Sequence, residues 1–132
     1  EKPFIDRARR FKQQFGGGMR QSGIVAAAAL HALEHHRDDL RIDVERAMFL
    51  ARGLQSTAGF SVDMGSVQSN IVRFGVEMDA GDFASECYSR GLYMLPSGQH
   101  GMRAVLHRDV SEEDVDAALQ IMKQVVSGAP NP

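Results

Sequence analysis

Two arginines stand in sequence settings that suit the binding of an anion. Arg20 follows three consecutive glycines, Gly16, Gly17 and Gly18, and precedes an alanine-rich run that is typical of a helix. Backbone N–H groups at the amino end of a helix form a ready anion site when a guanidinium lies beside them. A plain turn between two helices would explain the same glycines about equally well, so spacing alone leaves both interpretations open.

Arg103 lies within the run GMRAVLHRDV at 101–110, which predicts a strand. The two-residue period of a strand puts Arg103, Val105 and His107 on one face. A guanidinium among apolar residues costs desolvation unless an anion meets it, and its planar fork suits a carboxylate. An acidic partner in the same sheet is the plainer explanation, and spacing alone favours it. His107 by itself is more typical of a structural hydrogen bond than of a general base.

Other chemical motifs are incomplete. The stretch that begins at Gly18 has the glycine spacing of a phosphate-binding loop, but Ile24 and Val25 stand where that loop needs Lys and Ser or Thr. The run HRDVSEED at 107–114 is only superficially like the catalytic loop of a protein kinase. His31 and His35 are one helical turn apart, with no obvious third ligand, so no metal site is predicted.

The composition limits the classes of function. The chain has 132 residues, 43% of them hydrophobic and 24% charged, and a formal net charge of -2, which argues against a general binder of nucleic acid or of membrane surfaces. No apolar stretch approaches the roughly 20 residues of a membrane span. The only cysteine, Cys87, fits a reducing compartment and a structural role. We therefore expect a cytoplasmic protein, and its abrupt start at Glu1 suggests a piece of a longer polypeptide.

Hydrophobic periodicity predicts helices and strands in the order of an α+β sandwich. The small residues on both sides of the alanine-rich helix predict that it is buried. In the next helix Asp43 is expected to point outward, and Ser111 with Asp114 has the spacing of a capping box. The expected helices cover 3–15, 20–36, 38–54, 79–91 and 111–126, and the expected strands cover 70–76, 92–96 and 101–110.

Two segments, FKQQFGGGMRQSGIVAAAALHALEH and MRAVLHRDVSEEDVDAAL, resemble the carboxyl-terminal part of low-specificity L-threonine aldolases. These are pyridoxal-phosphate-dependent lyases with the aspartate-aminotransferase fold (fold type I), and the resemblance runs across nearly the whole chain. It implies that residues 1–36 hold the end of the large domain and its linking helices. Residues 37–132 would form the small carboxyl-terminal α+β domain, an antiparallel sheet with helices packed on it.

The resemblance also assigns roles. It implies that the enzyme cleaves L-threonine, L-allo-threonine or related β-hydroxy-α-amino acids to glycine and an aldehyde, as a homotetramer. Arg20 would contact the phosphate of pyridoxal 5'-phosphate or shape its pocket at a subunit boundary. Arg103 would grip the substrate carboxylate, which reverses the preference for an acidic partner. Family members often carry a lysine shortly before the glycines, where Gln13 and Gln14 stand here and Lys12 is slightly displaced.

Several catalytic and cofactor-binding residues of the family have no counterpart in this sequence. The Schiff-base lysine, the histidine stacked on the cofactor ring and the aspartate paired with its pyridine nitrogen all lie upstream of the glycine turn in the family. The chain alone is therefore expected to be inactive and to need the large domain of the same enzyme. Two alternatives remain: the small domain of another fold-type I lyase or transaminase, or a non-catalytic binding or oligomerisation module.

Overall fold

A computed structural model describes residues 1–129. These residues divide into two compact units, Glu1–Arg37 and the part that begins at Asp38. The helices are α1 (Lys2–Gln14), α2 (Gly23–His35), α3 (Asp39–Gln55), α4 (Ala80–Ser89), α5 (Glu112–Val126) and a short 3-10 helix (Met64–Ser66). The strands are β1 (Phe60–Ser61), β2 (Ile71–Val76), β3 (Leu95–Pro96) and β4 (Gly101–Val105).

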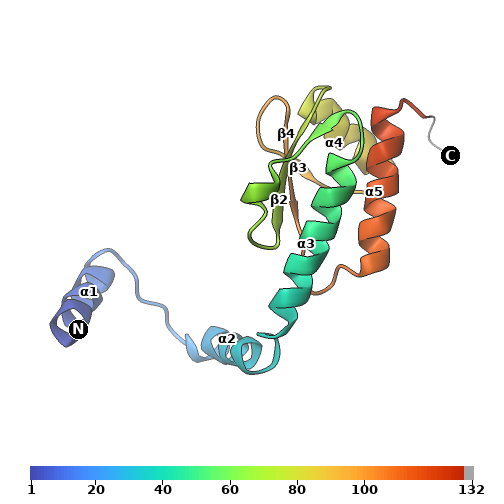
Figure 1. Cartoon of the computed structure of the whole chain (residues 1–132). Coiled ribbons are helices and arrows are strands. Elements are labelled where there is room, and N and C mark those ends of the chain that lie inside the picture. The colour runs from blue at the N-terminus through green and yellow to red at the C-terminus, as the bar shows by residue number, and fades with distance from the viewer. Residues whose placement is uncertain (130–132) are drawn as a thin grey trace. The chain divides into compact units, whose positions relative to one another are not determined.

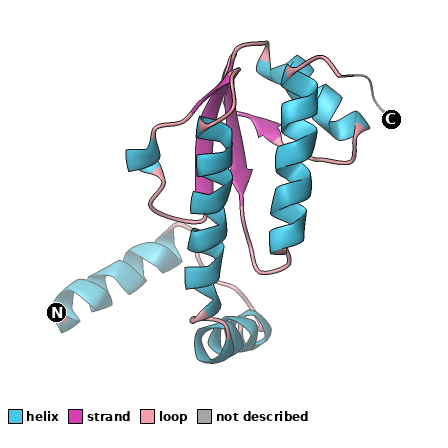
Figure 2. Ribbon diagram, turned by 45° about the vertical axis from the view of Figure 1, so that its right-hand side comes forward, coloured by secondary structure: helices cyan, strands magenta, loops and turns pink. Residues whose placement is uncertain are grey.

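The second unit is built on an antiparallel sheet with the strand order β1-β2-β4-β3 (Figure 1). Helices α3, α4 and α5 lie together beside this sheet (Figure 2). The central pair is β2 and β4, in which Val72 lies opposite Ala104 and Phe74 opposite Met102. Because Val72, Phe74 and Met102 are all buried, these alternate positions form the face that the helices cover. The predicted α+β class, a small domain with helices on an antiparallel sheet, is confirmed.

Aromatic rings fill the centre of the core. Phe83 of α4 has no exposed surface, and its ring lies 5.8 Å from that of Phe60 and 6.5 Å from that of Phe74, edge to face in both pairs. Helices α3 and α5 also approach closely, since a Cβ added at Gly53 would lie only 2.6 Å from Cδ1 of Leu119. The core therefore holds the sheet and the three helices together as one packed unit.

Helix α5 begins with the predicted capping box. The Ser111 hydroxyl accepts a hydrogen bond from the Asp114 amide at 3.1 Å, and a carboxylate oxygen of Asp114 accepts one from the Ser111 amide at 2.9 Å. The bond from the Ser111 backbone is the main reason that the pKa of Asp114 is lowered from its ordinary value of 3.8. These bonds satisfy two amides at the start of the helix and fix where the chain turns after β4.

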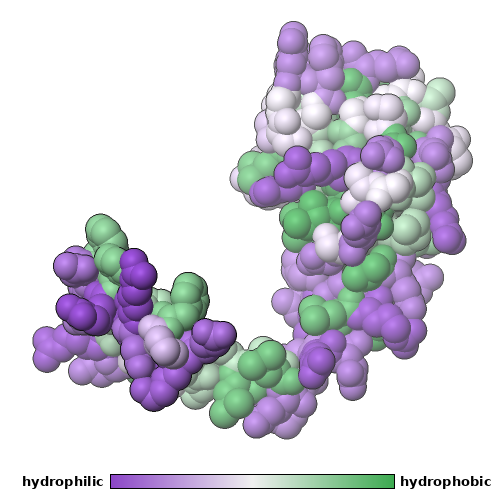
Figure 3. Space-filling view, turned by 60° about the vertical axis from the view of Figure 1, so that its left-hand side comes forward, coloured by the Kyte–Doolittle hydropathy of each residue, from purple (hydrophilic) through white to green (hydrophobic). Residues whose placement is uncertain are grey.

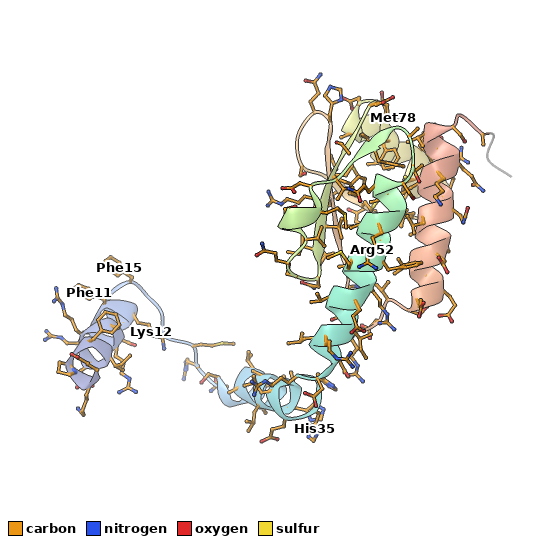
Figure 4. All side chains as sticks on the ribbon, viewed as in Figure 1. Phe11, Lys12, Phe15, His35, Arg52 and Met78 are labelled. Carbon is orange, nitrogen blue, oxygen red and sulfur yellow. The ribbon has the colours of Figure 1, made fainter. Side chains whose placement is uncertain are left out.

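The first unit has no buried residue in either of its helices. Phe11 of α1 and Phe15, the residue that caps its carboxyl end, stack with ring centroids 6.4 Å apart (Figure 4). In α2, Ile24 is 79% exposed and Leu33 is 67% exposed. Figure 3 shows apolar side chains on the surface of this unit. The prediction that helix 20–36 is buried is thus wrong for this chain, because small side chains permit close packing but no described residue covers them.

Other sequence predictions also need correction. Asp43 is 6% exposed, not outward-facing, because it lies one helical turn before the buried Ala47 on the same stripe of α3. The strand expected at 92–96 is confined to Leu95–Pro96, and the strand expected at 101–110 ends at Val105. Proline lacks the N–H that would continue the ladder. Strand β1 and the 3-10 helix were not predicted.

Candidate functional site

Arg103 projects from the face of β4 that the helices do not cover. The neighbours Met102 and Leu106 are 0% and 5% exposed, whereas Arg103 is exposed and Val105 is 44% exposed. The two-residue alternation predicted for this strand is therefore confirmed. His107 is also exposed, although it follows the strand and does not belong to it. The buried residues of β4 anchor the strand in the core and so hold the arginine at a defined place.

No described carboxylate pairs with Arg103, so the acidic partner that spacing alone favours is not found there. Directly opposite, on β2, lies a second arginine, Arg73. It is also exposed, and no motif in the sequence marks it as a site residue. Its alternation with the buried Val72 and Phe74 marks its face in the sequence, but only the strand register shows that it meets Arg103.

A cavity of about 430 Å³ lies beside Arg103 within the second unit. Most of its lining is apolar, including Leu95, Val105 and Ala118, and the polar lining comes from Arg103, His107, Asp114 and Tyr93. A mostly apolar hollow with a few placed polar groups is the usual form of a small-molecule site. The place of Arg103 at this hollow allows an anionic group of a ligand to meet its guanidinium.

Two of the other polar groups of the cavity, His107 and Asp114, are already engaged locally. Nδ1 of His107 accepts a hydrogen bond from the Asp109 amide at 3.3 Å and lies 3.9 Å from the Asp109 carboxylate. Asp114 serves the capping box of α5. These contacts agree with the interpretation of His107 as a structural residue and leave Arg103 as the strongest candidate for binding a ligand.

The glycines before Arg20 have a local explanation. Gly16 has φ +76°, its amide donates to the Gln13 carbonyl at 3.3 Å, and the Gly17 amide donates to the Lys12 carbonyl at 2.7 Å. This pair of bonds is the Schellman motif that ends helices. A Cβ at Gly17 would lie 2.6 Å from the Lys12 side chain. The helix-ending turn thus accounts for Gly16 and Gly17 without a ligand, and the anion interpretation rests on Arg20 and the helix that follows.

The amino end of α2 has no side-chain cap, although the Ile24 amide donates to the Gln21 carbonyl at 3.4 Å. Its N-cap, Ser22, has helical backbone angles, and its hydroxyl accepts no capping hydrogen bond. Arg20 is exposed, two residues earlier, and makes no ion pair with a described residue. Uncapped amides and an unpaired guanidinium at one helix end match what an anion requires. Arg20 lies in the first unit and Arg103 in the second, and each is described in its own unit.

Other sites are not supported. Within residues 1–129, no three His, Cys, Asp or Glu side chains are placed to hold a metal ion. His31 and His35 do contact each other, with ring centroids 4.4 Å apart. Cys87 is buried, and burial raises its pKa to about 11, so the thiolate needed for reaction is scarce. None of the described helices combines the length and the hydropathy needed to cross a membrane.

Known proteins resemble this chain in sequence. It is 34% identical over 128 residues to a probable low-specificity L-threonine aldolase 2 of Arabidopsis thaliana, which covers 94% of this chain and 36% of that protein. It is 37% identical over 112 residues to the low specificity L-threonine aldolase of Escherichia coli (strain K12), which covers 85% of this chain and 32% of that protein. The chain thus spans about a third of the length of these curated relatives.

Solved structures resemble it in fold. The cystine C–S lyase C-DES in complex with cysteine persulfide matches 77% of this chain and 28% of its own, with a TM-score of 0.64 and 21% identity. A C-DES mutant with glycine covalently linked to its PLP cofactor gives the same values. At this identity the likeness shows the fold alone, which is that of fold-type I enzymes.

A family profile adds the remaining evidence. The profile described as beta-eliminating lyase matches residues 1–77, more than half of the chain. This range includes the glycine turn, Arg20, helices α2 and α3 and the strand that carries Arg73. On this match, the chain belongs to the beta-eliminating lyase family.

Proposed function

We propose that this chain is the carboxyl-terminal part of a pyridoxal-phosphate-dependent aldolase. The complete enzyme cleaves L-threonine, L-allo-threonine or related β-hydroxy-α-amino acids to glycine and an aldehyde. The relatives at 34% and 37% identity are named as threonine aldolases, and this supports the choice of reaction within the family. In the proposal the first 36 residues complete the large domain and its linking helices, and the rest forms the small domain.

One observation carries the proposal. Arg103 presents a guanidinium that pairs with no carboxylate of residues 1–129, from the uncovered face of β4 and at the edge of a cavity that is otherwise mostly apolar. In our proposal this guanidinium binds the substrate's α-carboxylate through two parallel hydrogen bonds, an arrangement to which its planar fork is suited. The apolar lining beside it accommodates the hydrocarbon part of a small amino acid.

The residues near Arg20 fit the phosphate of pyridoxal 5'-phosphate. The uncapped amides of α2 can donate to phosphate oxygens, and the Arg20 guanidinium can offset part of the charge. We assign Arg20 to this contact, or to the pocket wall of an adjoining subunit. When bound, the cofactor supplies an electron sink for the bond that breaks at Cα.

The role of Arg103 in such a reaction is orientation. Such a reaction breaks one of the bonds at Cα, and the orientation of the bound substrate would decide which one. A two-point grip on the carboxylate fixes the rotation about Cα and so helps to select the Cα–Cβ bond. In this role Arg103 binds and orients the substrate and moves no proton.

We also propose that the complete enzyme is a cytoplasmic homotetramer. The exposed apolar residues of the first unit, among them Phe15 at 85% and Ile24 at 79%, would then contact the large domain or a second subunit. Light scattering on the purified complete enzyme measures its mass directly. A monomeric complete enzyme would contradict this part of the proposal.

The reaction is tested with the complete polypeptide that contains this chain, loaded with pyridoxal phosphate. We expect aldehyde release from L-threonine, L-allo-threonine or phenylserine, and none from the isolated 132-residue chain. Transfer of the amino group to a keto acid would instead identify a transaminase. Two results together would instead favour a binding module. The isolated chain would be folded, monomeric and soluble, and the complete protein would bind no pyridoxal phosphate.

The role of Arg103 is tested in the same enzyme by Arg103→Ala. Losing one hydrogen bond to a charged group costs about 1.5 to 3 kcal/mol, which is roughly tenfold or more in kcat/KM. The absorbance of the bound cofactor should remain, because Arg103 is assigned to the substrate and not to the cofactor. Arg52→Ala on α3 removes an exposed arginine elsewhere and serves as the matched control (Figure 4). Near-normal kinetics of Arg103→Ala would refute the assignment.

A further inference from the structure

Arg73 and Arg103 lie opposite each other on neighbouring strands, β2 and β4. Directly opposed residues of an antiparallel pair project from the same face of the sheet. The burial pattern agrees, since both arginines are exposed while Val72 and Met102 beside them are buried. Two positive charges therefore share the uncovered face of the sheet.

The hydrogen-bond pattern brings these two side chains close. The Leu106 amide donates to the Asn70 carbonyl at 2.8 Å, and the Val76 amide donates to the His100 carbonyl at 2.8 Å. In an antiparallel ladder such bonded pairs alternate with unbonded ones, so the pair of Arg73 and Arg103, three positions from either, is an unbonded pair. In unbonded pairs the Cα atoms are only about 4.5 Å apart and the side chains are closer.

Neither arginine has a protein partner among the described residues, although other arginines do. Arg41 pairs with Glu45 at 2.6 Å, and Arg90 donates to the Ala129 carbonyl at 2.8 Å. Like charges directly opposite each other in a sheet are destabilising. An arrangement that leaves two guanidinium groups together and without carboxylates is suited to an anion from outside the chain.

We propose that Arg73 and Arg103 together bind a dicarboxylate, and that the preferred substrate is a β-hydroxy-α-amino acid with a second carboxylate on its aldehyde side. This inference rests on the proposed function, because Arg103 holds the α-carboxylate there. That carboxylate offsets one positive charge and leaves the other, on Arg73, without a counter-ion. A second carboxylate two carbons away fills this place, as in 3-hydroxyaspartate, and both arginines are exposed, so a small dicarboxylate can reach the two of them at once.

The first experiment uses the 132-residue chain and measures binding, not activity. Succinate and acetate are titrated at equal ionic strength while NMR follows the side-chain N–H signals of the arginines. A second charge-assisted contact at an exposed site is worth about a factor of ten, so succinate should bind about tenfold more tightly than acetate. The signals of Arg73 and Arg103 should shift together.

Arg73→Gln should reduce the affinity for succinate to that for acetate, while the backbone spectrum stays folded. Arg52→Gln removes one positive charge from α3 and should leave the tenfold preference intact (Figure 4). Equal affinities for the two anions, or an equal loss in both variants, would overturn the proposal, because the pair would then act only as diffuse positive charge.

The second experiment uses the complete enzyme and compares kcat/KM for 3-hydroxyaspartate with kcat/KM for L-threonine. We expect Arg73→Gln to lower this ratio about tenfold, because threonine has no second carboxylate for Arg73 to bind. If the wild-type enzyme cleaves threonine but Arg73→Gln leaves the ratio of the two kcat/KM values unchanged, the inference is refuted. The proposed function would still stand in that case. If no substrate is cleaved although the chain binds succinate through Arg73, the proposed function fails and the dicarboxylate site remains.

Discussion

Removing either arginine of the β2 and β4 pair should make the second unit more stable. Two unit charges about 6 Å apart in a water-like dielectric repel by roughly 0.7 kcal/mol. This value lies within the range of about 0.2 to 1 kcal/mol for cross-strand pairs. Since both side chains are exposed and can bend apart, we expect the lower half of that range. Arg73→Gln and Arg103→Gln should therefore each raise the free energy of unfolding by about 0.5 kcal/mol at low salt.

A double-mutant cycle separates repulsion from unrelated effects of each substitution. The repulsion disappears once either charge is gone, so the double variant should be no more stable than the better single variant. The assay is urea unfolding followed by far-ultraviolet circular dichroism, at about 20 mM and 1 M salt, with Arg52→Gln as a charge-matched control. At 1 M salt the screening length is only about 3 Å, and the gain should vanish.

The outcome that refutes this reasoning is specific. The stability gains of the two single variants would add in the double variant, or each gain would be the same in 1 M salt as at low salt. Either result would mean that the side chains do not repel each other across the strands. The effect would then reflect strand propensity, and the opposed placement of the two guanidinium groups would lose its energetic support.

Three further predictions concern the packing and titration of the second unit. Gly53→Ala should destabilise it by about 1 to 2 kcal/mol in urea unfolding, because overpacking against Leu119 outweighs roughly 1 kcal/mol of helix propensity, and adding Leu119→Ala should cost less than the sum of the two single changes. Cys87 should not react with a thiol reagent at pH 8 until the chain unfolds. Because burial raises the pKa of Cys87 from 9.0 to about 11, the free energy of unfolding should fall as the pH rises between these values. The variant Cys87→Ala should lack this pH dependence. The hydrogen bond from the Ser111 amide lowers the pKa of Asp114, so Asp114 stabilises the folded state fully above its ordinary pKa of 3.8 and less in acid. Asp114→Asn should therefore lower the melting temperature at pH 7. The difference in melting temperature between the two proteins should shrink as the pH falls below 3.8.

Local signals in the sequence were sufficient where the structure is determined locally. Ser111 and Asp114 predict the start of α5, because a capping box joins residues three positions apart. The alternation around Arg103 predicts its face on β4, because the side-chain period of a strand depends only on the strand itself. The same holds for the order of the helices and for the α+β class.

Longer-range features could not be predicted in this way. The pairing of Arg73 with Arg103 depends on strand register, which joins residues thirty positions apart in the chain. The charge of Asp43 predicts an outward position, although the stripe of α3 on which it lies is buried. The alanine-rich α2 was predicted to be buried, yet composition shows only that a helix can pack closely and not which residues cover it. The roles of Arg20 and Arg103 still rest on resemblance and stay predictions.

The position of the arginine pair follows from the core of the second unit. Val72, Phe74 and Met102 are held between the sheet and helices α3, α4 and α5, and a slip of one residue in either strand would turn these side chains out of the core. The same register sets Arg73 opposite Arg103. Hydrophobic burial on one face of the sheet therefore holds two like charges together on the other, against their repulsion. A binding site for anions needs such an arrangement, because charges that find protein partners are no longer available to a ligand.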